Sequence, residues 1–401
     1  MTPQDTPVHT RLWHRDFWLL AMASLVLTMS VYILLPVVPQ WLMTVENFSP
    51  EETGLSMCVF GVGLYLFGAH CSWLVQRYRR NVVCMWAVIG IAVDAALLYY
   101  IDIMRSEFVE YWVIMIHRLL LGATFGLAQM VLSSTLIIDT CESFQRTAAN
   151  HCASWFSRLG MAAGPLAGVL VSQLGFPSDC GWLSQLNGFH GVVFCSVGLA
   201  LLALLLVKSA TFPFRTPKDQ LHFMSLDRFF LPHGTVLFLN LVLITTVLGL
   251  LLSLPLGAEF YGLVIGGFLL ALLAQRFVFP DAELKSEIVS GLILSLAALL
   301  VMLTHPESLV PPVLLGLGLG IIGSRFLLFF IKLSRHCQRG TSQSTYFLGW
   351  ETGVSLGLGL GYGLFYHHTG LLLGTALALT SLSLLMYSCF THRWFLKNKN
   401  R

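Results

Sequence analysis

The chain has 401 residues, of which 56% are hydrophobic and only 11% carry a charged side chain. A protein whose surface faces water needs more polar residues than this, so the composition excludes a soluble protein. The net charge of +3 is too small to indicate a nucleic-acid partner. The nine cysteines form no CxxC pair, and we expect neither a disulfide framework nor a metal site.

Twelve long apolar stretches follow one another along the chain. A helix rises about 1.5 Å per residue and the hydrocarbon core of a bilayer is about 30 Å thick, so each crossing needs about 20 mostly apolar residues. The sequence therefore predicts an all-α membrane protein. Its twelve transmembrane helices are expected at residues 17–43, 54–76, 82–104, 111–138, 149–174 and 188–207, then at 234–254, 256–275, 285–304, 310–334, 341–366 and 369–390.

These stretches form two groups of six, which predicts an N-terminal bundle at residues 17–207 and a C-terminal bundle at 234–390. The segments outside the bundles, at 1–16, 208–233 and 391–401, are expected to be a polar N-terminal segment, a linker and a basic tail. Placing all three in the cytoplasm puts 19 of the 23 Lys and Arg residues on that side. We expect a protein of the cytoplasmic (inner) membrane of a prokaryote, with both termini in the cytoplasm. No cleavable signal peptide is apparent.

The two groups of spans contain similar sequences in the same order. Residues 74–78 match 273–277 at an offset of 199, and three glycines of the fifth span match three of the eleventh at an offset of 193. Transporter folds are often built from repeated bundles. The matches therefore predict a duplicated six-plus-six architecture. The matching glycines are Gly160, Gly164 and Gly168 in the fifth span and Gly353, Gly357 and Gly361 in the eleventh.

Three motifs of the N-terminal half resemble those of the major facilitator superfamily. The loop at residues 72–80 is similar to the family signature between the second and third spans, but Ser72 and Gln76 stand where the family has Gly and Asp. Its basic cluster is retained as Arg77, Arg79 and Arg80. In the fourth span, residues 117–126 resemble the family's Arg-xxx-Gly element.

The fifth span carries the most specific motif, GxxxGPxxG, formed by Gly160, Gly164, Pro165 and Gly168. In the superfamily this element is associated with exporters that work as antiporters. Glycines four residues apart also form a smooth strip on which another helix can pack closely, and a proline bends a helix. The motif therefore has two interpretations, a packing face or an indicator of export. The resemblance implies a secondary transporter of two pseudo-symmetric bundles that alternates in access, and favours proton-coupled export.

Six ionisable residues of the predicted spans are candidates for a charge inside the membrane. A charge near the middle of the bilayer costs at least about 2.5 to 3.5 kcal/mol on insertion scales, so each should face a partner or a wet cavity. Arg325 and Glu351 lie at similar depth and could pair; Arg158, equivalent to Glu351 under the 193 offset, is an alternative partner. The six residues are Asp94, Arg118, Arg158, Glu259, Arg325 and Glu351.

A carboxylate in a cavity that is alternately wet and dry binds or releases its proton according to conformation, which is the minimum for proton coupling. Glu351 is the leading candidate for the proton carrier and Asp94 the second. Arg118 is a candidate to hold an anionic substrate group or to compete for the proton site. Glu259 lies near a helix end. Static ion pairs that lock helices together are the alternative for all of these residues.

The substrate pocket itself has no local signature, because several helices would build it. Aromatic and amide side chains within spans are candidates to line it, although such side chains more often face lipid or core. These candidates are Tyr32, Gln129, Trp155, Asn240, Tyr346 and Trp350.

No nucleotide-binding loop and no HExxH or GxSxG motif is present, so we expect a transporter rather than an enzyme. Its energy source would be the proton gradient, with no cofactor. The expected activity is proton-coupled efflux of a small amphipathic compound by a monomer in the lipid bilayer. Uptake or exchange of a small anionic metabolite or nutrient is the alternative, and a lipid scramblase or flippase is a further one.

Overall fold

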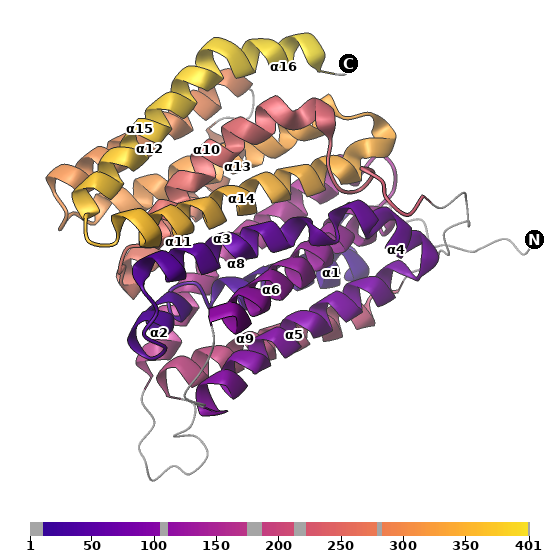
Figure 1. The fold of residues 1–401 in the computed structure, drawn as a ribbon. Helices are drawn as coiled ribbons and strands as arrows, with labels where there is room; N and C mark the ends of the chain where they lie inside the picture. The colour runs from indigo at the N-terminus through magenta and orange to yellow at the C-terminus, as the bar shows by residue number, and fades with distance from the viewer. Residues whose placement is uncertain (1–10, 105–110, 175–186, 212–221, 279–282, 400–401) are drawn as a thin grey trace, which may run out of the picture.

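The computed structural model describes residues 11–104, 111–174, 187–211, 222–278 and 283–399. Residues 1–10 of the predicted N-terminal segment, 212–221 of the predicted linker and 400–401 of the tail therefore lie outside the described residues. Within these ranges the chain is helical, with turns and short loops between helices and no strand. Figure 1 shows the N-terminal half, in indigo to magenta, lying beside the C-terminal half, in orange to yellow.

The N-terminal half contains a helix at each of its six predicted spans. The first span is interrupted at residues 33–37, where Pro36 lies, and the fourth contains one turn of π-helix, η2 (Leu132–Leu136). The helices are α1 (Arg15–Tyr32), α2 (Val38–Thr44), α3 (Pro50–Leu66), η1 (Gly68–His70), α4 (Cys71–Arg77), α5 (Arg80–Met104), α6 (Tyr111–Val131), α7 (Ile137–Asp139), α8 (Arg146–Gln173) and α9 (Gly188–Ser209).

The C-terminal half likewise contains a helix at each of its six predicted spans. Its last span continues through a π-helical turn into the basic tail. The helices are η4 (Pro232–Gly234), α10 (Thr235–Leu252), α11 (Ala258–Phe277), α12 (Leu284–Thr304), α13 (Val310–Leu333), η5 (His336–Gln338), α14 (Arg339–Phe365), α15 (Thr369–Met386), η6 (Tyr387–Thr391) and α16 (His392–Asn398).

Nine helical segments of the described chain are long and apolar enough to cross a membrane. The predicted spans outside this group correspond to α1, α8 and α14, which carry more polar residues. Many of those polar residues are buried, such as Ser24 in α1, Asn150 in α8 and Gln343 in α14. Each of these three helices therefore directs polar side chains into the bundle, which accounts for its lower apolar content.

The same helix packing occurs twice. In the N-terminal half α1 packs on α8, α3 on α6, and α5 on both α6 and α9; in the C-terminal half α10 packs on α14, α11 on α13, and α12 on both α13 and α15. The contacts between the halves are also duplicated, because α3 packs on α14 and α11 on α8. This repeated pattern is the one that two copies of a six-helix bundle produce.

The glycine strips that match in sequence also match in their packing. Gly160 lies against the backbone of α1 beside Thr28, and Gly353 lies against α10 beside Thr245. The glycines correspond at an offset of 193 residues and the threonines at an offset of 217 (245 minus 28). The two halves thus place a threonine beside the glycine although the first and fifth spans repeat at different offsets. The strip is therefore a packing face that both halves share, and it brings α8 and α14 close to the first helix of their own half.

The two halves contact each other near both ends of the helices. A Cβ atom at Gly54 in α3 would lie 2.6 Å from the Gly359 carbonyl oxygen in α14. At the other end, a Cβ atom at Gly340 would lie 2.5 Å from the Ser134 carbonyl oxygen. We call this second end the linker face, because residues 222–231 of the linker cross it. Close contacts thus hold α14 against the N-terminal half at both of its ends.

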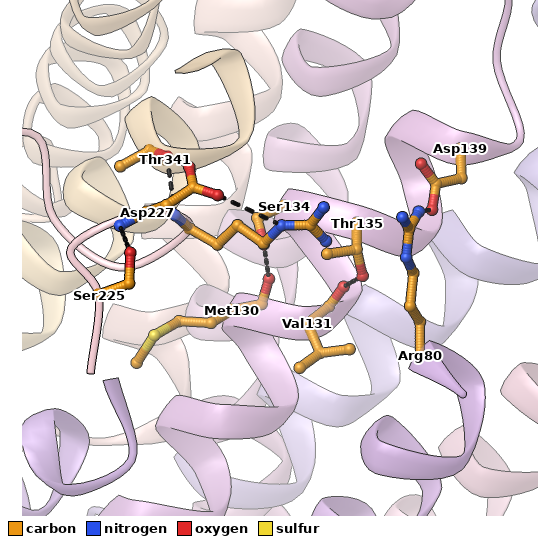
Figure 2. Close-up of polar contacts among 10 residues, drawn as sticks. Arg80, Met130, Val131, Ser134, Thr135, Asp139, Ser225, Asp227 and Thr341 are labelled. Carbon is orange, nitrogen blue, oxygen red and sulfur yellow. Dashed lines mark hydrogen bonds and ion pairs between the residues drawn. The ribbon is translucent and has the colours of Figure 1, made fainter. Parts of the chain in front are cut away.

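The described part of the linker is bonded to both halves at the linker face. The Ser225 amide donates to the Ala69 carbonyl of the N-terminal half over 2.9 Å. The Thr341 hydroxyl of α14 donates to the Asp227 carboxylate over 3.1 Å and accepts from the Arg228 amide over 2.9 Å. Figure 2 shows Asp227 between Ser225 and Thr341. The linker thus holds the start of α14 beside the N-terminal half.

Replacing Gly357 by alanine should destabilise the protein, because the new methyl group would overlap the Thr246 carbonyl oxygen and lie 2.6 Å from the Leu250 nitrogen of α10. Overpacking of this kind typically costs about 1 to 3 kcal/mol. Thermal unfolding of the purified protein in detergent measures the effect. Gly198→Ala is the matched control, since no atom lies within 4 Å of a Cβ there. Equal melting temperatures for both variants would contradict close packing of α14 on α10.

Candidate substrate and proton site

Glu351 of α14 makes a hydrogen bond across the interface between the halves. Its side chain is 1% exposed, and its Oε1 atom accepts a hydrogen bond of 2.9 Å from the Tyr32 hydroxyl of α1. Among the described residues Glu351 forms no ion pair. A buried carboxylate without a cationic partner is costly to ionise, so its protonation depends on what surrounds it.

Arg158 of α8 also reaches across the interface, in the opposite direction. Its Nη1 atom donates to the Gly320 carbonyl of α13 over 3.0 Å, and its Nε atom donates to the Ser154 carbonyl over 3.3 Å. The guanidinium carbon lies 4.3 Å from the centre of the Trp155 ring, a cation–π contact. Nη2 is buried and has no hydrogen-bond partner among the described residues.

The two residues occupy equivalent positions. Arg158 and Glu351 each lie twelve residues after the first residue of their helix, Arg146 in α8 and Arg339 in α14. At about 1.5 Å per residue, both lie roughly 18 Å into the helix. The sequence offset therefore predicts their depth correctly. The bridge between them that we considered is not formed, since Glu351 bonds Tyr32 and Arg158 bonds backbone carbonyls.

The expected pair between Arg325 and Glu351 is also not formed. Arg325 instead donates through Nε to Glu287 of α12, a carboxylate that is 1% exposed and that was not among the residues predicted from the sequence. Similar depth is not sufficient for pairing, because α13 presents Arg325 toward α12 within the C-terminal half. The signal that could have found Glu287 is its place in the first turn of a span, where a buried carboxylate needs a cation.

A small cavity, which we call the carboxylate cavity, contains Glu351 together with Tyr32 and Arg118. Arg118 of α6 is 3% exposed, and its Nε and Nη2 atoms have no hydrogen-bond partner among the described residues. The empty volume is about 370 Å³. An arginine and a glutamate thus share one enclosed space without forming an ion pair, and a proton on Glu351 would change the charge of that space.

Two larger cavities lie between the halves and share Arg158, Met161 and Trp350. The apolar cavity, with an empty volume of about 730 Å³, is lined mainly by leucine and aromatic side chains such as Phe260 and by Pro165. The polar cavity, of about 400 Å³, contains seven serine, glutamine and tyrosine side chains: Ser24, Ser133, Ser154, Ser157, Gln129, Gln343 and Tyr346. Among the residues that line these two cavities, Arg158 carries the only charge.

Four predicted pocket residues, Tyr32, Gln129, Tyr346 and Trp350, line one or more of these cavities. A fifth, Trp155, stacks against Arg158 just outside them. The other predicted residues lie elsewhere. Asn240 donates to the Ser383 carbonyl inside the C-terminal half, Asp94 accepts from Thr124 inside the N-terminal half, and Glu259 is exposed in the first turn of α11.

The loop between the second and third spans retains one ionic contact. Arg80, the first residue of α5, pairs with Asp139 at the end of α7, and Figure 2 shows the two side chains pointing toward each other. Arg77 and Arg79 are exposed, and Gln76 is partly buried at the end of α4. The acid that the loop lacks at Gln76 is therefore supplied by another span of the same half.

The sequence matches the Major Facilitator Superfamily over residues 20–358, which is most of the chain. This chain belongs to the Major Facilitator Superfamily. It is therefore an integral membrane transporter and not an enzyme. No curated protein sequence is significantly similar to it.

Solved structures of other superfamily transporters share the fold at low sequence identity. A bacterial homologue of the human lysosomal transporter Spinster has a TM-score of 0.68 at 15% identity, covering 98% of this chain and 99% of that one. The human organic anion transporter MFSD10 (TETRAN) has a TM-score of 0.65 at 14% identity, with 93% and 98% covered. The E. coli fucose:proton symporter FucP has a TM-score of 0.64 at 13% identity, with 98% and 100% covered.

The two buried glutamates should differ in their effect on stability. Arg325→Gln leaves the Glu287 carboxylate without its cation and should destabilise this superfamily member by about 3 to 5 kcal/mol. Glu351→Gln breaks no ion pair and keeps an oxygen that accepts from Tyr32, so it should cost less than about 1 kcal/mol. Melting temperatures of the purified variants test the contrast. A larger loss for Glu351→Gln would show that Glu351 has an ionic role in the fold.

Proposed function

We propose that this transporter couples the movement of a small amphipathic compound to the movement of protons, with Glu351 as the proton carrier. The observation that carries the proposal is the hydrogen bond of 2.9 Å between Glu351 and Tyr32, which joins the two halves beside a cavity containing Arg118. A rocking motion that separates the halves breaks this bond. The affinity of Glu351 for a proton then differs between the two access states.

Arg118 supports this role by lying in the same cavity. When Glu351 is ionised, the guanidinium of Arg118 can compensate its charge; when Glu351 is protonated, the guanidinium remains without an anionic partner. The carboxylate cavity and the apolar cavity are both lined by Tyr32. A compound in the apolar cavity therefore lies close to the hydrogen bond that holds Glu351, which gives a physical route for exchange between substrate and proton.

We further propose that transport is export by antiport, through a monomer in the inner membrane of a prokaryote with both termini in the cytoplasm, and that no cofactor takes part. The support for export is the glycine and proline element at 160–168, in which Pro165 lines the apolar cavity. The support for the orientation is the concentration of Lys and Arg residues at the linker face and the termini.

Proteoliposomes with an acidic lumen and a trapped pH dye should show substrate-dependent proton movement for the wild type and none for Glu351→Gln. The expected loss is at least about tenfold, because the amide cannot release a proton at this position. Glu307→Gln is the matched control, since Glu307 is an exposed carboxylate in a loop. Proton movement by Glu351→Gln at the wild-type rate would overturn its assignment as the carrier.

The direction of coupling is measured in the same vesicles with a labelled substrate. Antiport moves protons and substrate in opposite directions, and symport moves them in the same direction, whichever way the protein is inserted. Substrate and proton fluxes of the same sign would therefore replace export with uptake. Substrate movement that is independent of any imposed proton gradient would overturn the coupling itself.

A further inference from the structure

We infer that the substrate is an amphipathic anion, whose oxyanion group binds in the polar cavity at Arg158 and whose apolar part occupies the apolar cavity. This inference deepens the proposed function and rests on the same space between the halves. It starts from the charge of the two cavities. Of the residues that line them, Arg158 alone is charged, and it forms no ion pair among the described residues.

The polar cavity contains several hydrogen-bond donors that the described residues do not use. Arg158 Nη2, Tyr346 Oη and Trp350 Nε1 are all buried and have no hydrogen-bond partner among these residues. All three residues line the polar cavity. Buried donors normally find acceptors, because an unmade hydrogen bond in the interior costs about 1 to 3 kcal/mol. A carboxylate, sulfonate or phosphate offers several acceptor lone pairs and fits such a set of donors.

The Arg158 guanidinium, the Tyr346 hydroxyl and the six-membered ring of Trp350 come close together at Gly323 of α13. A Cβ atom at this position would overlap Arg158 Nη1, and it would lie 3.0 Å from the Trp350 ring and 3.1 Å from the Tyr346 hydroxyl. The missing side chain thus leaves room for the guanidinium. The arrangement joins one helix of the N-terminal half with two of the C-terminal half, so that a ligand held here contacts both.

The apolar cavity explains why the anion should carry an apolar part. It shares Arg158, Met161 and Trp350 with the polar cavity and is lined beyond them by side chains such as Leu248 and Phe268. A ligand that spans the two cavities would bury its apolar part on one side of Arg158 and its charged group on the other.

Three ligands of the same shape and different charge test this inference: 4-phenylbutanoate, 4-phenylbutan-1-ol and 4-phenylbutylammonium. Binding of radiolabelled 4-phenylbutanoate is measured at equilibrium in nanodiscs, without a proton gradient, and the other two ligands are added as competitors. The carboxylate should bind at least about tenfold more tightly than the alcohol or the amine. Equal or tighter binding of the amine or the alcohol would overturn the inference.

Variants of Arg158 separate binding from folding. Arg158→Gln should weaken binding of 4-phenylbutanoate at least about tenfold and remove the preference over the alcohol, and Arg158→Lys should restore part of it. Lys208→Gln removes an exposed cation and serves as the matched control. Should Arg158→Gln fail to fold, Tyr346→Phe and Trp350→Phe each delete one donor and should each weaken anion binding about threefold or more. Unchanged binding by folded Arg158→Gln, or by both aromatic variants, would overturn the inference.

Two further competitors, lysophosphatidate and inorganic phosphate, identify the source of the anion. Competition by lysophosphatidate as well as by 4-phenylbutanoate would extend the site to anionic lipid, and inorganic phosphate should compete poorly because it lacks an apolar part.

The proposed function and the inference about the substrate can fail separately. An anion that binds through Arg158 but moves no protons would overturn coupling and leave the substrate class intact. Proton movement driven by the amine or alcohol, and not by the carboxylate, would overturn the substrate class and leave the coupling intact.

Discussion

The structure depends on the burial of two opposite charges at equivalent depth in the two halves. Arg158 and Glu351 each have a hydrogen-bond partner in the other half, at Gly320 and Tyr32. A charge in this region is costly to leave without a partner, so the environment of both groups is set by how the halves are packed. Because the two charges are not paired with each other, each can respond separately to a ligand or a proton.

The glycine strips show which part of the fifth-span motif occurs in both halves and which part occurs only in the N-terminal half. Both α8 and α14 use glycines to approach the first helix of their half, so the glycines alone carry no information about the direction of transport. The proline is different, because Pro165 corresponds to Leu358 under the offset of 193 residues. Any asymmetry that the element introduces between the halves therefore arises at Pro165, which lines the apolar cavity.

The sequence predicts those parts of the molecule that depend on distance along the chain. The twelve helices follow from apolar length, and the equal depth of Arg158 and Glu351 follows from the repeat. It does not predict contacts between helices, because depth does not determine which way a side chain points around its helix. For this reason Glu287 was missed as the partner of Arg325, and the unused donors at Tyr346 and Trp350 became visible only in the folded chain.

Tyr32 connects the two proposed roles. Its ring lines the apolar cavity and its hydroxyl donates to Glu351, so both cavities meet at one side chain. A substrate whose apolar part displaces this ring would lengthen or break the hydrogen bond and leave the Glu351 carboxylate facing Arg118. Loss of the hydrogen bond from Tyr32 disfavours the ionised form of Glu351, whereas the nearby Arg118 favours it. The balance between these two effects decides whether substrate binding releases a proton. An anion bound to Arg158 in the polar cavity can bind without neutralising Arg118, which lines the carboxylate cavity and not the polar one. Two arginines in separate cavities thus allow the substrate and the carboxylate of Glu351 each to have its own cation.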